Sequence, residues 1–168
     1  MIISLPLAHL LRFIIFVLVQ VLVLKNIGIP MLEVLLYPLF IIMLPFRTPH
    51  WLLLLIAFFT GIIIDAFYSS LGIHTSALVF MAFLRHYLSI GMAPRGGYDA
   101  SETPTKLRMG IAWWSQYVGI LMFIHILAYL LVLDRFEISF MLILRILYAY
   151  IMSMLLAVMY SYLLNPRE

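Results

Sequence analysis

The sequence has no cysteine and very few charged residues. Its 168 residues include ten Lys or Arg and seven Asp or Glu, so 10% of the chain is charged. Soluble domains carry about 25% charged residues, and disorder requires high charge with low hydrophobicity. Both classes are therefore excluded. The lack of cysteine excludes disulfides, thiolate catalysis and cysteine-ligated metals. A net charge of +3 is too small to indicate nucleic-acid binding.

Apolar residues are abundant instead, at 66% of the chain, and they form continuous runs such as 13–24 and 51–64. A transmembrane β-strand would alternate apolar and polar residues over about ten positions. A transmembrane helix needs about 20 mostly apolar residues, so the chain has room for about six spans and for no large domain outside the membrane. The predicted fold class is an all-α integral membrane protein. We expect a six-transmembrane helix bundle that forms a single membrane domain over residues 1–168.

Breaks rich in proline, glycine and charged residues separate the predicted spans. The spans cover residues 5–24, 31–44, 51–67, 73–92, 110–133 and 138–164. The second is short and contains Pro38, which predicts a tilted, kinked or partly interfacial segment. Residues 1–11 contain no Lys or Arg, so the first apolar run is interpreted as a retained span and not as a cleaved signal. Residues 93–109 are predicted to be an exposed, mobile loop, which acts as a solvated linker or docks a cytoplasmic partner or anionic lipid.

The basic residues of the connecting segments predict the orientation. Most of them fall on the side that also holds both termini, namely Arg47, Arg95, Lys106, Arg108 and Arg167, while Lys25 and Arg135 fall on the other side. Because basic residues favour the cytoplasmic side, both termini are predicted to be cytoplasmic. The three tryptophans, Trp51, Trp113 and Trp114, fall near the start of spans at this same face, where tryptophan prefers to lie.

Charged residues inside the spans need a partner, because a charge costs at least about 2.5–3.5 kcal/mol at the centre of a bilayer. Asp65 ends a stripe of small residues that includes Ala57 and Gly61, and Arg145 begins a similar stripe on the last span. Both stripes repeat every fourth residue, a spacing that lets membrane helices approach closely. We therefore predict that Asp65 and Arg145 form a buried ion pair. The alternatives are a substrate or partner contact, or no pairing.

Two further arginines are closer to the cytoplasmic ends of their spans. Arg12 is predicted to extend its side chain toward the membrane surface. Arg85 either does the same or makes an internal contact. The five histidines show no metal-ligand spacing, so hydrogen bonding at interfaces or between helices is the expected role of His9, His50, His74, His86 and His125. No catalytic arrangement is recognisable, and no enzymatic activity and no cofactor are predicted.

Residues 61–74 contain a motif that resembles the signature of the MreD family of rod shape-determining membrane proteins. Gly61 is followed four residues later by Asp65, then by a short turn containing Ser69 and Ser70, and then by Leu71-Gly72 before the next span. The similarity extends over residues 44–85, and the chain is most similar to MreD-like sequences of the Bacteroidetes type. The family's motif residues correspond to Gly61, Asp65 and Gly72 in this chain. Arg145 is added from the residue pattern alone.

This resemblance implies a fold and a function. MreD is similar in fold to the substrate-binding S components of ECF transporters. It implies a non-catalytic component of the cell-elongation complex (the elongasome) in the bacterial inner membrane, which supports peptidoglycan synthesis and rod shape. The implied direct partner is an MreC-like single-span protein. RodA, a class B penicillin-binding protein, RodZ and MreB are the implied further members of the complex.

A second function is also compatible with the sequence. An S-component-like subunit would bind a small molecule for transport in a pocket that opens to the outer side. Tyr68, Ser69, Ser70 and His74 are predicted to lie on that side. A cavity larger than about 300 Å³ there would favour transport.

Overall fold

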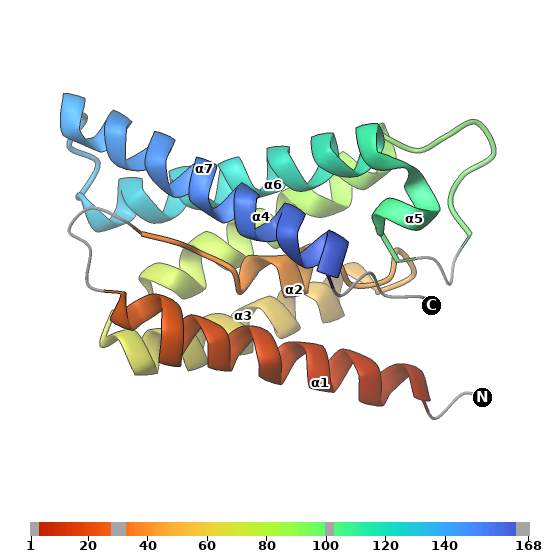
Figure 1. Ribbon diagram of the computed structural model, residues 1–168, viewed down its shortest axis with the longest axis horizontal. Coiled ribbons are helices and arrows are strands. Elements are labelled where there is room, and N and C mark those ends of the chain that lie inside the picture. The colour runs from red at the N-terminus through yellow and green to blue at the C-terminus, as the bar shows by residue number, and fades with distance from the viewer. Residues whose placement is uncertain (1–3, 28–32, 100–102, 164–168) are drawn as a thin grey trace.

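A computed structural model describes residues 4–27, 33–99 and 103–163, and these residues form a helical bundle without strands (Figure 1). The bundle's helices are α1 (Ser4–Leu18), α2 (Pro38–Ile42), α3 (His50–Tyr68), α4 (Ile73–Gly91), α5 (Lys106–Met109), α6 (Ile111–Leu133) and α7 (Phe140–Leu163). A π-helix (Val19–Val23) and a 3-10 turn (Leu24–Asn26) continue α1. Met31, at the predicted start of the second span, lies outside the described residues, as do residues 100–102, 164 and Arg167.

Long apolar helices dominate the bundle. Four stretches are long and apolar enough to cross a membrane: His9–Asn26, His50–Tyr68, Ile111–Leu133 and Phe140–Leu163. They coincide with the predicted first, third, fifth and sixth spans to within a few residues. The all-helical fold class is therefore confirmed, and helices of this kind indicate a membrane protein. The predicted fourth span is also a helix, α4, but its polar residues, among them His74 and Arg85, make it less apolar.

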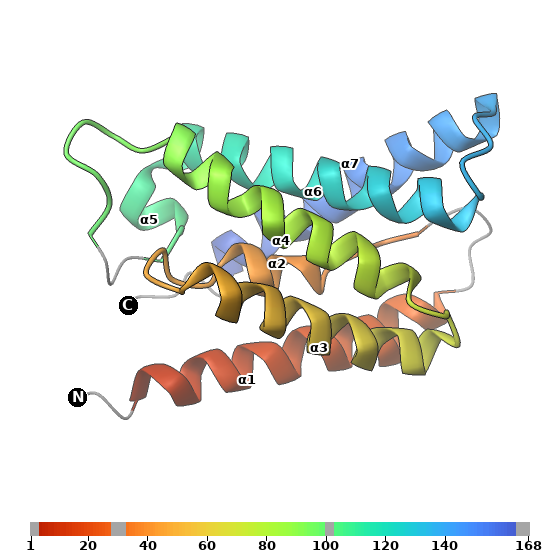
Figure 2. The same ribbon diagram turned by 180° about the vertical axis from the view of Figure 1, so that it is seen from behind.

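The long helices run in two opposite directions, and α1 and α3, which the irregular second segment separates, run the same way. Figures 1 and 2 show α1, α3 and α6 running one way and α4 and α7 returning, with α4 packed between α3 and α6. The start of α1, α5 and the end of α7 therefore share one end of the bundle, which we call the terminal end. The α3–α4 and α6–α7 turns lie at the opposite, far end.

The predicted second span is mostly not helical. Residues 33–36 are extended, and the only regular helix in the described part of this segment is the five-residue α2. Pro38 occupies the first turn of α2, where its missing N–H costs nothing, and the chain turns again at Pro45. Every residue of α2 is buried. The segment thus runs through the interior of the bundle, where irregular backbone is tolerated at membrane depth.

Side chains from two other helices satisfy the extended backbone of this segment. Gln20, in the π-helix, accepts a hydrogen bond from the Leu36 amide at 2.7 Å and donates one to the Val34 carbonyl at 3.0 Å. Ser153 on α7 accepts from the Leu35 amide at 2.9 Å. Buried backbone groups need such partners because no water reaches them. The π-helix turns the fully buried Gln20 toward this task.

Two arginines are buried that could have reached the membrane surface. Arg85 is 3% exposed, and its guanidinium donates to the carbonyls of Ile42, at 3.3 Å, and Leu44. It thus binds carbonyls at the end of α2 that have no helical partner. Of the two alternatives for Arg85, the internal contact is confirmed. Arg12 is 9% exposed, so the prediction that its side chain extends to the membrane surface was wrong. The side chain is buried because Arg12 lies on the inner face of α1.

The connection between α4 and α6 is partly packed and not a uniformly solvated loop. Residues 94–97 are exposed as predicted. The Tyr98 ring, however, stacks on Phe46 at 3.9 Å between centroids, and Thr103 and Thr105 are buried. Burial raises the pKa of Tyr98 to about 12, so the ring stacks as a neutral phenol. The prediction of an exposed loop over 93–109 was therefore wrong for Tyr98 and for residues 103–105, whose side chains pack, whereas Leu107 and Arg108 are exposed.

The tryptophans also differ from one another. Trp51 is 64% exposed at the terminal end, as expected of an interfacial tryptophan. Trp113 donates from its indole N–H to the Met92 carbonyl at 3.0 Å. Trp114 is 1% exposed and faces the core of the bundle.

Candidate functional site

The MreD-like motif residues build a tight corner between α3 and α4 at the far end. Gly61 allows the two helices to touch, since a Cβ at this position would overlap the Cα of Thr75. Ser69 ends α3 with a left-handed φ of 55°, and Gly72 precedes α4 with a φ of 83° that favours glycine. Gly61 and Gly72 thus each meet a different steric requirement of the same corner.

Asp65 joins this corner to the start of α4. Its carboxylate accepts hydrogen bonds from the backbone amides of His74, at 3.0 Å, and Thr75, at 2.9 Å. It also accepts from the hydroxyls of Thr75, at 2.5 Å, and Ser70, at 2.6 Å. The first amides of a helix have no partner within the helix, and its N-terminus attracts negative charge. Asp65 therefore caps α4 from the neighbouring helix.

Arg145 lies in a separate cluster of charges at the far end. It donates to both carboxylate oxygens of Asp134, at 2.6 and 2.8 Å, and to Glu33 at 2.6 Å. Asp134 belongs to the α6–α7 turn, and Glu33 begins the extended segment. Arg145 therefore ties α7 to two other parts of the chain.

The predicted Asp65–Arg145 ion pair was wrong. Each charge is satisfied by other groups: Asp65 by the start of α4, Arg145 by Asp134 and Glu33. The prediction relied on the two small-residue stripes and the opposite charges on them. A stripe shows which face of its own helix is small, but not which other groups a side chain on that face meets.

A buried network of hydrogen bonds lies at the centre of the bundle. The hydroxyl of Tyr37 lies 2.9 Å from Nδ1 of His74 and 2.7 Å from Nε2 of His125. One hydroxyl can donate to one ring and accept from the other, which links the irregular segment to α4 and α6. The ring of His74 also stacks on Tyr129 at 4.6 Å. The expected hydrogen bonding between helices is thus confirmed for His74 and His125.

The side chains expected around an outer pocket are largely occupied by packing. Tyr68 is hydrogen-bonded to Gln20 at 2.7 Å, Ser70 is bonded to Asp65, and His74 is buried. A cavity of about 300 Å³ lies at this end beside the α6–α7 turn, but its walls are residues from Leu133 to Ser139. It does not exceed the size that would favour a transport function.

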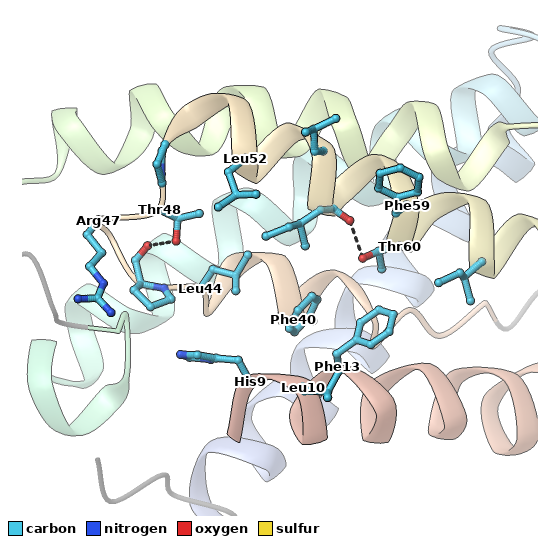
Figure 3. A pocket seen from close by; sticks show the side chains of 15 residues that line it. His9, Leu10, Phe13, Phe40, Leu44, Arg47, Thr48, Leu52, Phe59 and Thr60 are labelled. Carbon is cyan, nitrogen blue, oxygen red and sulfur yellow. Dashed lines mark hydrogen bonds between the residues drawn. The ribbon is translucent and has the colours of Figure 1, made fainter. Parts of the chain in front are cut away.

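A larger hollow lies at the terminal end, between α1 and α3. It has a volume of about 1140 Å³, and Figure 3 shows its apolar walls and floor. Phe13 comes from α1, Phe40 from α2 and Phe59 from α3, while Arg47 and His9 lie at one end of the hollow. We call this hollow the α1–α3 groove.

Within the described ranges, no three His, Asp or Glu side chains come close enough together to hold a metal ion. No protein-family model, curated protein or solved structure matches this chain. The candidate sites thus rest on the chain's own geometry: the α3–α4 corner, the Arg145 cluster, the Tyr37 network and the α1–α3 groove.

Sequence reasoning missed Gln20 and Tyr37 as organising residues. A glutamine in the middle of an apolar run was a usable signal, because an amide in a membrane helix needs a hydrogen-bonding partner. Tyr37 directly precedes Pro38 in a run of apolar residues and gave no such signal. Its role depends on two histidines that are distant in sequence.

Proposed function

We propose that this chain is a six-pass, MreD-like, non-catalytic component of the bacterial cell-elongation complex. Both termini are cytoplasmic, and the chain binds an MreC-like single-span protein. RodA, a class B penicillin-binding protein, RodZ and MreB are further members of the complex. The proposal includes a fold similar to ECF S components.

The observation that carries the proposal is the α3–α4 corner. The residues of the MreD-like motif, Gly61, Asp65 and Gly72, act in one local structure: a close helix contact, a carboxylate cap and a left-handed turn. Such a motif is demanding, because each residue type meets a separate physical requirement. The separate structural role of each motif residue in this corner supports the family resemblance.

The course of the chain supports the six-pass topology. α4 returns between α3 and α6, and the segment leading into α2 passes through the interior of the bundle (Figure 2). α4 and the second segment, added to the four long apolar helices, give an even number of passes. The start of α1 and the end of α7 accordingly lie at the same end. That end also carries Arg47, Arg95, Lys106 and Arg108, which favours a cytoplasmic location.

Co-purification tests the proposed function. The full chain, produced with an MreC-like single-span protein from the same cell, is expected to retain that partner through size-exclusion chromatography. Depletion of the chain is expected to turn rod-shaped cells into spheres. Failure to retain the partner, combined with unchanged cell shape, would reject the proposal.

An S-component-like subunit remains the second candidate. The observation in its favour is the concentration of polar and aromatic side chains toward the far end, including Tyr68, His74 and Tyr129. Opening this cluster would create a site with stacking surfaces and hydrogen-bonding groups. A thermal-shift screen of vitamins and other small molecules tests this candidate, since a bound ligand raises the unfolding temperature.

A further inference from the structure

The α1–α3 groove is formed by the divergence of two membrane helices. The π-helix at the end of α1 contacts α3 at the far end, and α1 then separates from α3 toward the terminal end (Figures 1 and 2). Phe40 and Leu44, which are 7% and 5% exposed, form the floor. The groove is therefore a lateral opening in the bundle with a closed, apolar base.

One face of α3 forms the long wall of the groove. The lining residues of this wall recur at three- and four-residue spacing, as Leu52, Leu55, Ile56, Phe59, Thr60 and Ile63. Eleven helical steps from Leu52 to Ile63 correspond to about 17 Å. The hydrocarbon core of one leaflet is about 15 Å deep, half of a bilayer core of about 30 Å. The groove thus has the length of an acyl chain in one leaflet.

The terminal end of the groove carries positive charge. Arg47 is exposed and makes no ion pair with any residue that the structure describes. The groove lining contains no Asp or Glu, while His9 and Thr48 lie at the same end as Arg47 (Figure 3). The hydroxyl of Thr48 donates to the Pro45 carbonyl at 2.8 Å and keeps acceptor capacity only. Arg47 is therefore the strongest donor available to an anion at this position.

We propose that the α1–α3 groove binds an anionic phospholipid, with the lipid phosphate at Arg47 and acyl chains along α3. A cation above an apolar groove matches the two halves of a lipid, and basic pockets between helices on the cytoplasmic side select acidic headgroups. An apolar transmembrane helix of a partner, about 10–12 Å wide, would fill the groove but would leave Arg47 without an anion. The lipid uses both features.

Lipid selectivity is the first test. The purified full chain in mild detergent is titrated with phosphatidylglycerol or with zwitterionic phosphatidylcholine of identical acyl chains, and bound lipid is counted by native mass spectrometry. Phosphatidylglycerol is expected to bind about five- to tenfold more tightly. Soluble glycerol phosphate is expected not to bind, because it lacks acyl chains. Equal binding of both lipids would overturn the proposal.

Matched arginine variants locate the headgroup. Arg47→Ala is expected to abolish the preference for phosphatidylglycerol, while Arg47→Lys retains part of it. Arg95→Ala removes the same charge from an exposed position outside the groove and is expected to keep the preference. An equal loss in Arg47→Ala and Arg95→Ala would show attraction to the whole basic surface, and would overturn a site at Arg47.

Matched tryptophan variants locate the acyl chains. Leu55 lines the groove and is 45% exposed, whereas Ile62 lies on the same helix outside the groove and is 43% exposed. Leu55→Trp is expected to reduce phosphatidylglycerol binding at least fivefold, and Ile62→Trp to leave it unchanged. If Leu55→Trp instead leaves lipid binding unchanged and abolishes retention of the MreC-like partner, the groove holds a protein helix and the lipid proposal is wrong.

This inference goes beyond the proposed function and shares with it only the cytoplasmic placement of the terminal end. The lipid measurements use the isolated chain, without any elongation partner. A lack of lipid selectivity would contradict the lipid site and would say nothing about the MreC-like partner. Failure to bind that partner would contradict the proposed function and would not change the lipid result. Failures of the two proposals are therefore distinguishable.

Discussion

At the scale of single residues, Asp65 and Arg145 show how a buried charge is stabilised in this protein. Asp65 accepts hydrogen bonds from the start of α4, and Arg145 donates to Asp134 and Glu33. The groups that bind Asp65 and the groups that bind Arg145 have no residue in common. Each charge therefore contributes to stability through its own local network, and the two contributions are expected to be independent.

Independence predicts additive mutational effects. Asp65→Asn replaces an acceptor-only carboxylate by an amide whose NH₂ cannot accept from the α4 amides, and it is expected to cost about 1.5–3 kcal/mol. Arg145→Gln is expected to cost a similar amount by leaving two carboxylates without their cation. The double variant is expected to lose the sum within about 0.5 kcal/mol. The free energy of unfolding in detergent is measured for the two single variants and the double variant. A coupling energy above about 1 kcal/mol between the two substitutions would indicate a direct Asp65–Arg145 interaction.

Gly61 gives a second prediction at the residue scale. Gly61→Ala is expected to destabilise the protein by about 1–3 kcal/mol, because the new methyl group meets the backbone of Thr75 and forces α3 and α4 apart. Gly91→Ala is the matched control on a helix. No atom lies within 4 Å of its new methyl group, so this change is expected to be neutral or to stabilise by up to about 1 kcal/mol. Equal effects of the two substitutions on the free energy of unfolding would show that α3 and α4 do not pack closely at Gly61.

At the scale of elements, the irregular second segment distinguishes this bundle from six simple helices. Its extended residues, 33–36, lack helical hydrogen bonds, and Gln20 and Ser153 replace them. Arg85 serves the carbonyls at its other end. The segment is thus held by side chains of the π-helix, α4 and α7.

Removing one of these side chains tests the segment. Gln20→Leu keeps similar volume but leaves the Leu36 amide and the Val34 carbonyl without their partners, at an expected cost of about 1–2 kcal/mol. Faster hydrogen exchange is expected at residues 34–36. Gln116→Leu is the matched control, since Gln116 is exposed on α6, and it is expected to change stability by less than about 0.5 kcal/mol. Unchanged exchange in Gln20→Leu would contradict this account.

At the scale of the whole molecule, the two ends of the bundle differ in chemistry. The terminal end carries most of the connecting-segment arginines and lysines and the exposed Trp51. The far end carries the α3–α4 corner and the Arg145 cluster. Such an asymmetry is typical of membrane proteins, because basic residues favour the cytoplasmic side.

The orientation can be tested with single cysteines, because the natural chain contains none and gives no background. Pro94→Cys marks the terminal end and Leu71→Cys the far end, and both positions are exposed. In intact cells whose outer membrane is permeabilised, a membrane-impermeant maleimide is expected to label Leu71→Cys alone. Both variants are expected to react after the cells are broken. Labelling of Pro94→Cys in intact cells would show that the proposed orientation is reversed or that the topology is wrong.

The sequence by itself determined the class of protein and the positions of the long helices. Hydropathy is a local property that can be summed along the chain, so the ends of α3, α6 and α7 followed to within a few residues. The motif at Gly61, Asp65 and Gly72 was visible for the same reason, since all its residues lie within twelve positions, 61–72.

Only the tertiary structure decided the partners of buried polar groups. Tyr37 meets His74 and His125, which are 37 and 88 residues away in sequence, and Arg145 meets Glu33 from 112 residues away. The choice among several possible partners depends on the rotation and tilt of each helix, which apolar runs do not specify. The broken second segment follows the same rule, because side chains from distant helices replace the hydrogen bonds that a continuous helix would have supplied itself.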